Sequence, residues 1–363
     1  MSGNRVENLD LLRASAVTMV VFYHVFSLEK PFVTVDFLYL VRTWWSSADL
    51  FFVLSGFLIG NLYWKEHIKL GVVRKKTFWQ RRWLRTIPPY LVAMHLAYLA
   101  KSMFGTEPVV YNWKYLFFLQ NYTNFPYFSL SWTLCIEEQF YIFLPLALPL
   151  LIRIKHKNLV FFLAFITPIM FRMALPTYIF STGEQFYFNT HTHSESLVVG
   201  VWVAYLLNFQ PDWLQRIGQA SRYLAPVFLV VILGWNLMFP MNFKFLTIYM
   251  FTFLSVGYGM ILVYAVTQPA LCIARWQPVK HVAVISYSIY LTHALTIHVY
   301  SALYSRFLQG WPTWILALLV FGMVYGAGLV FAKLIEQPAI ALRDRLVASP
   351  TAVWIPEAAQ KIS

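Results

Sequence analysis

The segment Phe245–Val266, which reads FLTIYMFTFLSVGYGMILVYAV, decides the fold class of this chain. It contains no Asp, Glu, Lys or Arg, and about 20 mostly apolar residues are enough to cross the hydrocarbon core of a bilayer as a helix. The whole 363-residue chain is 59% hydrophobic and 12% charged, against about 45–50% and about 25% in average globular proteins. The sequence therefore predicts an integral membrane protein and excludes a disordered chain, which lacks the apolar residues needed for collapse.

Nine further segments are apolar enough to be interpreted as membrane spans, although Ser194–Phe209 is short. We therefore predict an all-α, polytopic membrane helical bundle of about ten transmembrane helices. One domain covers residues 1–345 and a cytoplasmic C-terminal tail covers 346–363. Residues 115–128 are apolar but interrupted by polar residues and a proline, which favours a re-entrant or interfacial segment. The ten predicted spans are Leu11–Leu28, Ser46–Trp64, Pro88–Phe104, Ser129–Ile152, Leu159–Leu175, Ser194–Phe209, Tyr223–Phe239, Phe245–Val266, Val282–Tyr304 and Trp311–Ala332.

The basic residues indicate the orientation of the chain. The net charge is +13, with 28 Lys and Arg against 15 Asp and Glu. In a membrane protein such an excess usually reflects the accumulation of Lys and Arg on the cytoplasmic side, and no nucleic-acid-binding motif is present. With the N-terminus inside, the inner segments contain 21 of the 28 basic residues, eight of them in residues 65–85. Both termini are therefore predicted to be cytoplasmic.

The first span contains two ionisable residues, which are costly inside a membrane and by default mark a working site. Arg13 and His24 are eleven residues apart, or about 1100° of helical rotation, so they share one face. The helical rise separates them by roughly 16 Å along the axis. This spacing puts Arg13 near the cytoplasmic surface and His24 near the midplane. A hydrogen bond between helices is the alternative interpretation of His24.

Polar residues also occur at the ends of the second and third spans. Asp49 starts the second span, where it is either a helix cap, a partner for a neighbouring base or a site residue. Arg82 and Arg85 lie on one helical face just before Pro88. Their guanidinium groups match the geometry of phosphate. They indicate either a phosphate-binding site or a topological anchor that contacts lipid phosphates.

The fourth and ninth spans contain the remaining candidates. Glu137 and Glu138 are adjacent carboxylates that point about 100° apart on a helix, and a buried carboxylate either pairs with a base or stays protonated. On the ninth span, Tyr290 lies one turn from His293, which is either a second site histidine or a packing partner. The His-x-His pair before the sixth span hints at a metal, but no further ligand group is evident, so we predict no metal site.

Six stretches follow one another in a recognisable order, and together they resemble the acyltransferase 3 family of integral membrane acyltransferases. The resemblance runs from about residue 8 to residue 345. Each stretch is moderately specific, and their common order makes a chance match improbable. The stretches are Asn8–Arg13 continuing to Tyr23-His24, Ala48–Phe57, Phe78–Arg85 with Pro88, Trp132–Glu137 continuing to Tyr141, Ile285–His293 and Ile335–Pro338.

The resemblance implies ten spans in a bacterial cytoplasmic (inner) membrane and acyl transfer from cytoplasmic acyl-CoA, often acetyl-CoA. The family's acceptors are usually hydroxyls of glycans, lipid-linked sugars or secreted small molecules. Its Arg-x10-His, Arg-x-x-Arg and tryptophan-to-glutamate patterns fall on Arg13 and His24, on Arg82 and Arg85, and on Trp132 and Glu137.

These expectations assign a role to each candidate residue. His24 is the predicted general base or, alternatively, the acylated nucleophile. We expect acyl-CoA, a hydroxyl acceptor and membrane lipids as partners, and neither a metal nor nucleic acid. A transporter is the alternative function, because polar residues at mid-membrane also suit one; no matching pair of broken spans is present in the two halves. The predicted catalytic residues are His24, Glu137 and Asp49, the acyl-CoA-binding residues Arg13, Arg82 and Arg85, and the substrate-binding residues Trp132, Tyr290 and His293.

Overall fold

A computed structural model describes residues 3–28, 32, 44–104, 108–123, 125, 127–174, 187–238 and 244–347. All regular secondary structure in these ranges is helical, which confirms the predicted all-α class. The predicted C-terminal tail lies outside the described residues from position 348 onward.

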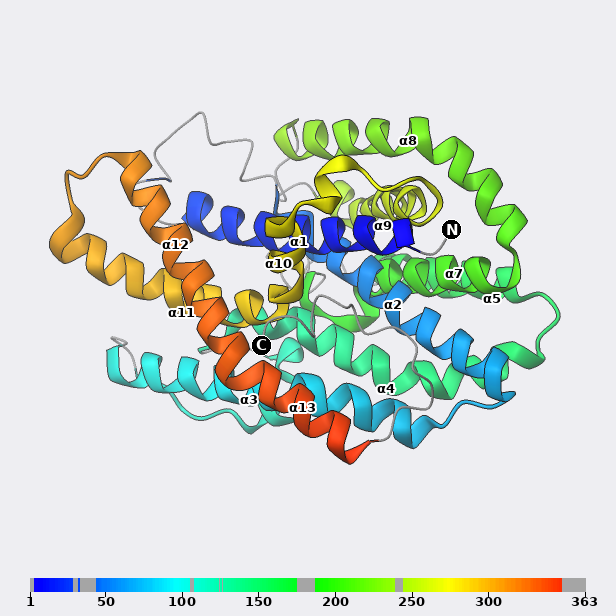
Figure 1. Ribbon diagram of the computed structural model, residues 1–363, viewed down its shortest axis with the longest axis horizontal. Helices are drawn as coiled ribbons and strands as arrows, with labels where there is room; N and C mark the ends of the chain where they lie inside the picture. Colours follow the sequence, from blue (N-terminus) through cyan, green and yellow to red (C-terminus); the bar gives the residue numbers. More distant parts are fainter. Residues whose placement is uncertain are drawn as a thin grey trace.

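Long helices form most of the molecule (Figure 1). They are joined by short 3-10 turns, including η3 (Trp113–Phe117), η4 (Gln120–Tyr122), η5 (Ser129–Ser131), η7 (Thr190–Thr192) and η8 (Cys272–Arg275), and by two π-helical turns, η9 (Tyr304–Leu308) and η10 (Ala332–Glu336). The α-helices are α1 (Gly3–Leu28), α2 (Ser47–Leu70), α3 (Lys75–Phe104), α4 (Trp132–Arg153), α5 (Lys157–Ala174), α7 (Glu195–Phe209), α8 (Pro211–Met238), α9 (Lys244–Thr267), α10 (Gln277–Val284), α11 (Ser286–Leu303), α12 (Thr313–Phe331) and α13 (Gln337–Leu346).

Six helical segments of the described chain are long and apolar enough to cross a membrane, and a seventh is added if α10 and the helix that follows it form one span bent by 74°. The protein is therefore a multi-pass membrane protein. Three other predicted spans are helical but fail this criterion of length and composition: α3 contains three arginines in its first half, α7 has 15 residues, and α8 starts with a polar segment. The six segments are Glu7–Phe26, Trp44–Leu70, Ser129–Arg153, Lys157–Ala174, Ile248–Thr267 and Thr313–Leu346.

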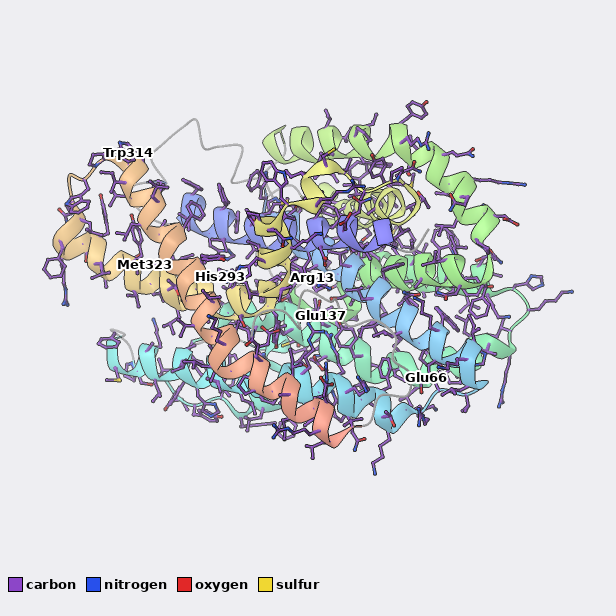
Figure 2. All side chains as sticks on the ribbon, viewed as in Figure 1. Arg13, Glu66, Glu137, His293, Trp314 and Met323 are labelled. Atoms are coloured by element: carbon purple, nitrogen blue, oxygen red, sulfur yellow. The ribbon has the colours of Figure 1, made fainter. Side chains whose placement is uncertain are left out.

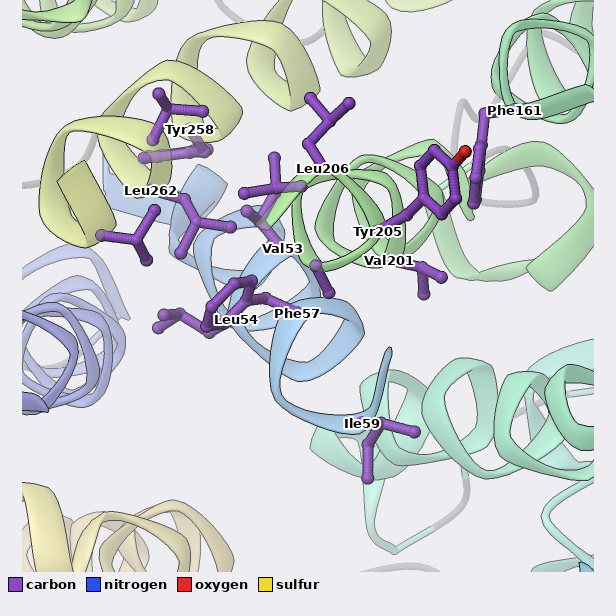
Figure 3. Close-up of a cluster of buried hydrophobic side chains, with 14 of the residues drawn as sticks. Val53, Leu54, Phe57, Ile59, Phe161, Val201, Tyr205, Leu206, Tyr258 and Leu262 are labelled. Atoms are coloured by element: carbon purple, nitrogen blue, oxygen red, sulfur yellow. The ribbon is translucent and has the colours of Figure 1, made fainter. Parts of the chain in front are cut away.

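The helices pack around two main hydrophobic clusters. One lies among α2, α4, α5, α7, α8 and α9, and Figure 3 shows part of it, including Val53, Leu206 and Tyr258. The other lies among α1, α3, α4, α11 and α12 and includes Val17 and Val320. Helix α1 contacts α2, α9, α10 and α11, and it runs through the middle of the bundle in Figure 1. Its polar residues are therefore placed between the two clusters.

Glycines allow α2 and α7 to approach closely. A Cβ atom on Gly56 would lie 2.1 Å from the carbonyl oxygen of Leu197, and one on Gly200 would lie 2.2 Å from the carbonyl oxygen of Val53. Small residues at helix interfaces let backbones come together in membranes. This contact joins the second and third turns of α2 to the first two turns of α7, and Asp49 at the start of α2 lies beside Ser196 at the start of α7.

The segment predicted to be re-entrant or interfacial forms short 3-10 turns rather than a long helix in its described part. Phe118 has a φ of 56°, which is an outlier for a bulky residue. Its carbonyl oxygen accepts a hydrogen bond of 2.6 Å from Gln139 Nε2 of α4. This bond ties the segment to the helix that contains Glu137.

Candidate active site

Two histidines from different helices meet in the centre of the bundle. His24 lies near the end of α1, and His293 lies in the middle of α11. Their ring centroids are 5.1 Å apart, and the ring planes are inclined by 68°. The structure thus brings together two of the predicted site residues that are 269 positions apart in the sequence. Figure 2 places the labelled His293, Arg13 and Glu137 near the middle of the molecule, away from Glu66 and Trp314.

Backbone hydrogen bonds fix the same tautomer in both neutral rings. Nδ1 of His24 lies 2.8 Å from the carbonyl oxygen of Val20, and Nδ1 of His293 lies 2.6 Å from that of Tyr290. A carbonyl oxygen only accepts, so Nδ1 carries the hydrogen in each ring. Each Nε2 is left with a lone pair, as a general base requires.

The ring of Tyr290 lies beside this histidine pair, but its hydroxyl forms hydrogen bonds with residues at the start of α4 and just before it. The ring centroid lies 5.6 Å from that of His293. The hydroxyl donates to the carbonyl oxygen of Leu130 over 2.7 Å and accepts from Thr133 Oγ1 over 2.5 Å. Tyr290 therefore joins α11 to the start of α4, and its predicted role in substrate binding stays a prediction.

Two of the three predicted acyl-CoA arginines, Arg13 and Arg85, lie around the same carboxylate. Arg13 of α1 and Arg85 of α3 both interact electrostatically with Glu336, which lies in the π-helical turn η10. Ser288 Oγ donates to this carboxylate over 2.5 Å. Arg13 also lies 3.8 Å from Asp10. Basic groups from α1 and α3 therefore surround one acidic residue at the end of the bundle where α1 begins.

Arg82 and Arg85 have different partners although they are one turn apart. Arg82 lies 3.7 Å from Glu137 and 3.9 Å from Glu138, and its guanidinium covers the ring of Tyr141 at 4.2 Å. Arg85 has no ion pair within 4.0 Å among the described residues. Arg82 is therefore occupied by two buried carboxylates, and Arg85 is better placed to bind a phosphate.

Glu137 faces Arg82 rather than the histidine pair. Ser55 Oγ of α2 donates to Glu137 Oε1 over 2.6 Å, and Glu138 accepts from Thr86 Oγ1 over 3.0 Å. The two carboxylates point in different directions, as the helical period predicts, yet both reach Arg82 because it lies between them. A catalytic role of Glu137 stays a prediction.

Asp49 belongs to a second polar cluster at the first turns of α2 and α7. It accepts hydrogen bonds from His193 Nε2 over 3.1 Å and from Ser196 Oγ over 2.7 Å, and all three residues are fully buried. Burial lowers the pKa of His193, but the Asp49 carboxylate outweighs it, so the pKa of His193 is raised overall. Among the described residues, Asp49 contacts His193 instead of His24, and its predicted catalytic role stays untested.

Trp132 packs into this second cluster. Its ring is nearly parallel to that of His193 at 5.7 Å, with an interplanar angle of 19°, and its centroid lies 4.5 Å from that of Tyr187. Tyr187 interacts electrostatically with Asp49, Tyr23 and Tyr290. Because Tyr23 precedes His24, Tyr187 connects the second polar cluster with the neighbourhood of the histidine pair.

Comparison with known proteins decides the family. The model of the Acyltransferase domain family (Acyl_transf_3) matches residues 6–333. The chain belongs to the acyltransferase 3 family. No solved structure is significantly similar to it.

Several bacterial relatives in this acyltransferase family are named as O-acetyltransferases. "Putative O-acetyltransferase SACOL0978" of Staphylococcus aureus (strain COL) is 33% identical over 221 residues, covering 55% of this chain and 35% of the relative. "O-acetyltransferase OatA" of Staphylococcus aureus (strain NCTC 8325 / PS 47) is 26% identical over 321 residues, covering 80% of this chain and 50% of the relative. The chain thus spans between about a third and a half of the length of these relatives.

The structure of this acyltransferase family member also contains a buried ion pair that the sequence analysis missed. Arg172 of α5 lies 2.7 Å from Glu195 of α7, and both side chains are fully buried. Arg172 also donates to the carbonyl oxygen of Ile248 over 2.8 Å and to that of Thr192. The available signal was a lone arginine in the otherwise apolar segment 159–175. No group of three or more potential metal ligands occurs among the described residues.

Proposed function

We propose that this protein is an integral membrane O-acyltransferase that moves an acetyl group from cytoplasmic acetyl-CoA to a hydroxyl of a glycan, a lipid-linked sugar or a secreted small molecule. The names of its relatives support acetyl transfer to oxygen. The observation that carries the proposal is the joint position of Arg13 and Arg85 around Glu336 and of the histidine pair eleven residues further along α1.

The distance along α1 between Arg13 and His24 suits the pantetheine arm of acetyl-CoA. Arg13 and His24 share a helical face and lie roughly 16 Å apart along the axis. The phosphates of CoA would bind at Arg13 and Arg85, because guanidinium groups match phosphate oxygens. The pantetheine arm would then follow α1 and bring the thioester to the histidines. His24 Nε2 would remove the proton from the acceptor hydroxyl as its oxygen attacks the acyl carbon.

We also propose that the chain crosses the bacterial cytoplasmic membrane ten times with both termini inside. Side-chain contacts support alternating helix directions. The first halves of α1 and α3 meet the turn after α12 around Glu336, which fits one membrane side. The starts of α2 and α7 meet the end of α5 around Asp49, His193 and Arg172, which fits the other side. This arrangement agrees with the basic loop 65–85 on the inner side.

Purified protein in detergent or liposomes tests the activity. We expect acetyl-CoA to be consumed and free CoA thiol to be released when an acceptor is present. His24→Ala should reduce product formation at least about 10²-fold, because a general base contributes about 10²–10⁴-fold. Thiol release by the variant close to that of the unaltered protein would contradict the assignment. Substrate flux into liposomes without consumption of acetyl-CoA would instead favour a transporter.

A further inference from the structure

We propose that His293 is a second catalytic residue that works in series with His24 and returns the acceptor's proton to the departing thiolate of the donor. This inference rests on the proposed acyl transfer and adds the proton path to it. The geometry of the two rings, their equivalent hydrogen bonds and the burial of His293 carry the argument.

The two imidazoles have the same orientation toward their own backbones. In both rings Nδ1 donates to a carbonyl oxygen of the preceding turn, at 2.8 Å for His24 and 2.6 Å for His293. Each ring can therefore gain and lose a proton only at Nε2 without breaking its backbone bond. With their centroids 5.1 Å apart, the rings lie close enough for one substrate group to contact both.

The surroundings of His293 indicate a functional rather than a packing role. Its side chain is fully buried, and its Nε2 has no hydrogen-bond partner among the described residues. Buried polar atoms are nearly always paired, so an unpaired acceptor is unusual. A histidine that only joined helices would use this nitrogen for an interhelical hydrogen bond. Here the nitrogen remains available beside His24.

The relay balances atoms and charge. The acceptor O–H bond breaks, its proton moves to Nε2 of His24, and a C–O bond forms to the acyl carbon. The proton then passes from Nε2 of His24 to Nε2 of His293. When the tetrahedral intermediate collapses, the C–S bond breaks and the thiolate takes this proton to form an S–H bond. Both histidines return to their neutral tautomers, and no further reactant is needed.

Two acyl donors with different leaving groups distinguish the roles of the histidines. Acetyl-pantetheine has the same alkyl thiol leaving group as acetyl-CoA, which benefits from protonation. S-(4-nitrophenyl) thioacetate releases an aryl thiolate that departs without a proton. Glycerol serves as the hydroxyl probe, and release of each thiol is followed with the full-length protein in detergent. A general acid should matter only for the alkyl donor, whereas a general base should matter for both.

His293→Asn is the informative variant, because an Asn amide can keep the hydrogen bond to the carbonyl oxygen of Tyr290 but has no equivalent of Nε2. We expect its kcat with acetyl-pantetheine to fall by about 10²- to 10⁴-fold and its kcat with the aryl donor to stay within about threefold. His24→Asn should lose activity with both donors. His95→Asn is the matched control, since His95 makes the same kind of backbone bond, to Leu91 over 2.7 Å, at an exposed position.

The outcomes separate the relay from the proposed function. If His293→Asn slows both donors equally, or slows neither, the relay is wrong while acyl transfer stands. If the unaltered protein consumes neither donor, the proposed function itself is wrong and the relay with it. Thermal unfolding and gel filtration check that each variant is folded, and His293→Ala, which also lacks Nε2, replaces the Asn variant if that one is unstable.

Discussion

At the scale of single residues, we expect different effects from replacing Arg82 and Arg85 although both belong to the same Arg-x-x-Arg motif: one change should affect protein stability and the other donor binding. Arg85 has no close ion pair among the described residues, so Arg85→Gln should weaken donor binding without unfolding the protein. A hydrogen bond to a charged group contributes about 1.5–3 kcal/mol, so we expect the KM for acetyl-CoA to rise by about 10- to 100-fold. The KM for acetyl-pantetheine, which lacks the adenosine phosphates, should not change.

Arg82→Gln should instead lower the free energy of unfolding by about 3–5 kcal/mol, because it leaves two buried carboxylates unpaired.

Kinetics with both donors and thermal unfolding in detergent check this pair of variants. Equal effects of Arg85→Gln on acetyl-CoA and acetyl-pantetheine would contradict a phosphate-binding role. An Arg82→Gln variant as stable as the unaltered protein would show that Glu137 and Glu138 do not depend on this arginine.

Residue spacing predicted the part of the candidate site that lies within one helix, because the helical period determines which side chains of a helix share a face. Arg13 and His24 lie on one face because the helical period alone fixes their relation. The partner of Asp49 is His193, which is 144 positions away, and the meeting of His24 with His293 depends on how α1 packs against α11. Such contacts follow from tertiary packing, so no spacing rule could have identified them. The same holds for the pairing of Arg172 with Glu195 across α5 and α7.

At the scale of helices, the close contact of α2 and α7 predicts a strong effect of one methyl group. Gly200→Ala would place a Cβ 2.2 Å from the carbonyl oxygen of Val53 and 2.6 Å from the amide nitrogen of Phe57. Both atoms belong to the backbone, so the helices must separate. We expect a loss of about 1–3 kcal/mol in stability, the usual cost of overpacking.

Gly322→Ala is the matched control for this substitution. Gly322 is also helical, in α12, and a Cβ there would meet nothing within 4 Å. Alanine is favoured over glycine in a helix by about 0.8–1.0 kcal/mol, so the control should be neutral or slightly stabilising. Thermal unfolding of both variants in detergent measures the difference. A Gly200→Ala variant as stable as Gly322→Ala would contradict the close packing of α2 and α7.

The sequence predicted the existence of these helices better than their relation to the membrane. Apolar segments such as Phe245–Val266 are recognisable because their composition alone decides the outcome. Helix α3 has Arg81, Arg82 and Arg85 close to its apolar half, and these arginines are half-buried by contacts with other parts of the protein. Hydropathy counts such residues as exposed to lipid, so it cannot decide whether α3 crosses the membrane.

At the scale of the whole molecule, the two cysteines allow a direct test of orientation. Cys272, in the turn between α9 and α10, is exposed, whereas Cys135 is buried. With both termini inside, the turn with Cys272 is cytoplasmic. A membrane-impermeant maleimide should therefore label the protein in inside-out vesicles and leave it unlabelled in intact cells. Cys272→Ser should abolish labelling, and labelling of intact cells at Cys272 would reverse the proposed topology.

In the proposed mechanism, the central helix α1 sets the distance that the donor must span. The 11-residue interval between Arg13 and His24 would hold the anion-binding end and the reactive end at a fixed distance and a fixed angle. Inserting a single residue would lengthen the interval by about 1.5 Å and turn His24 by about 100° away from His293. Only insertions of whole helical turns would keep both groups on one face. The distance over which a donor arm can be accommodated is therefore adjustable only in coarse steps of about 5.4 Å, which makes arm length a property that this scaffold measures.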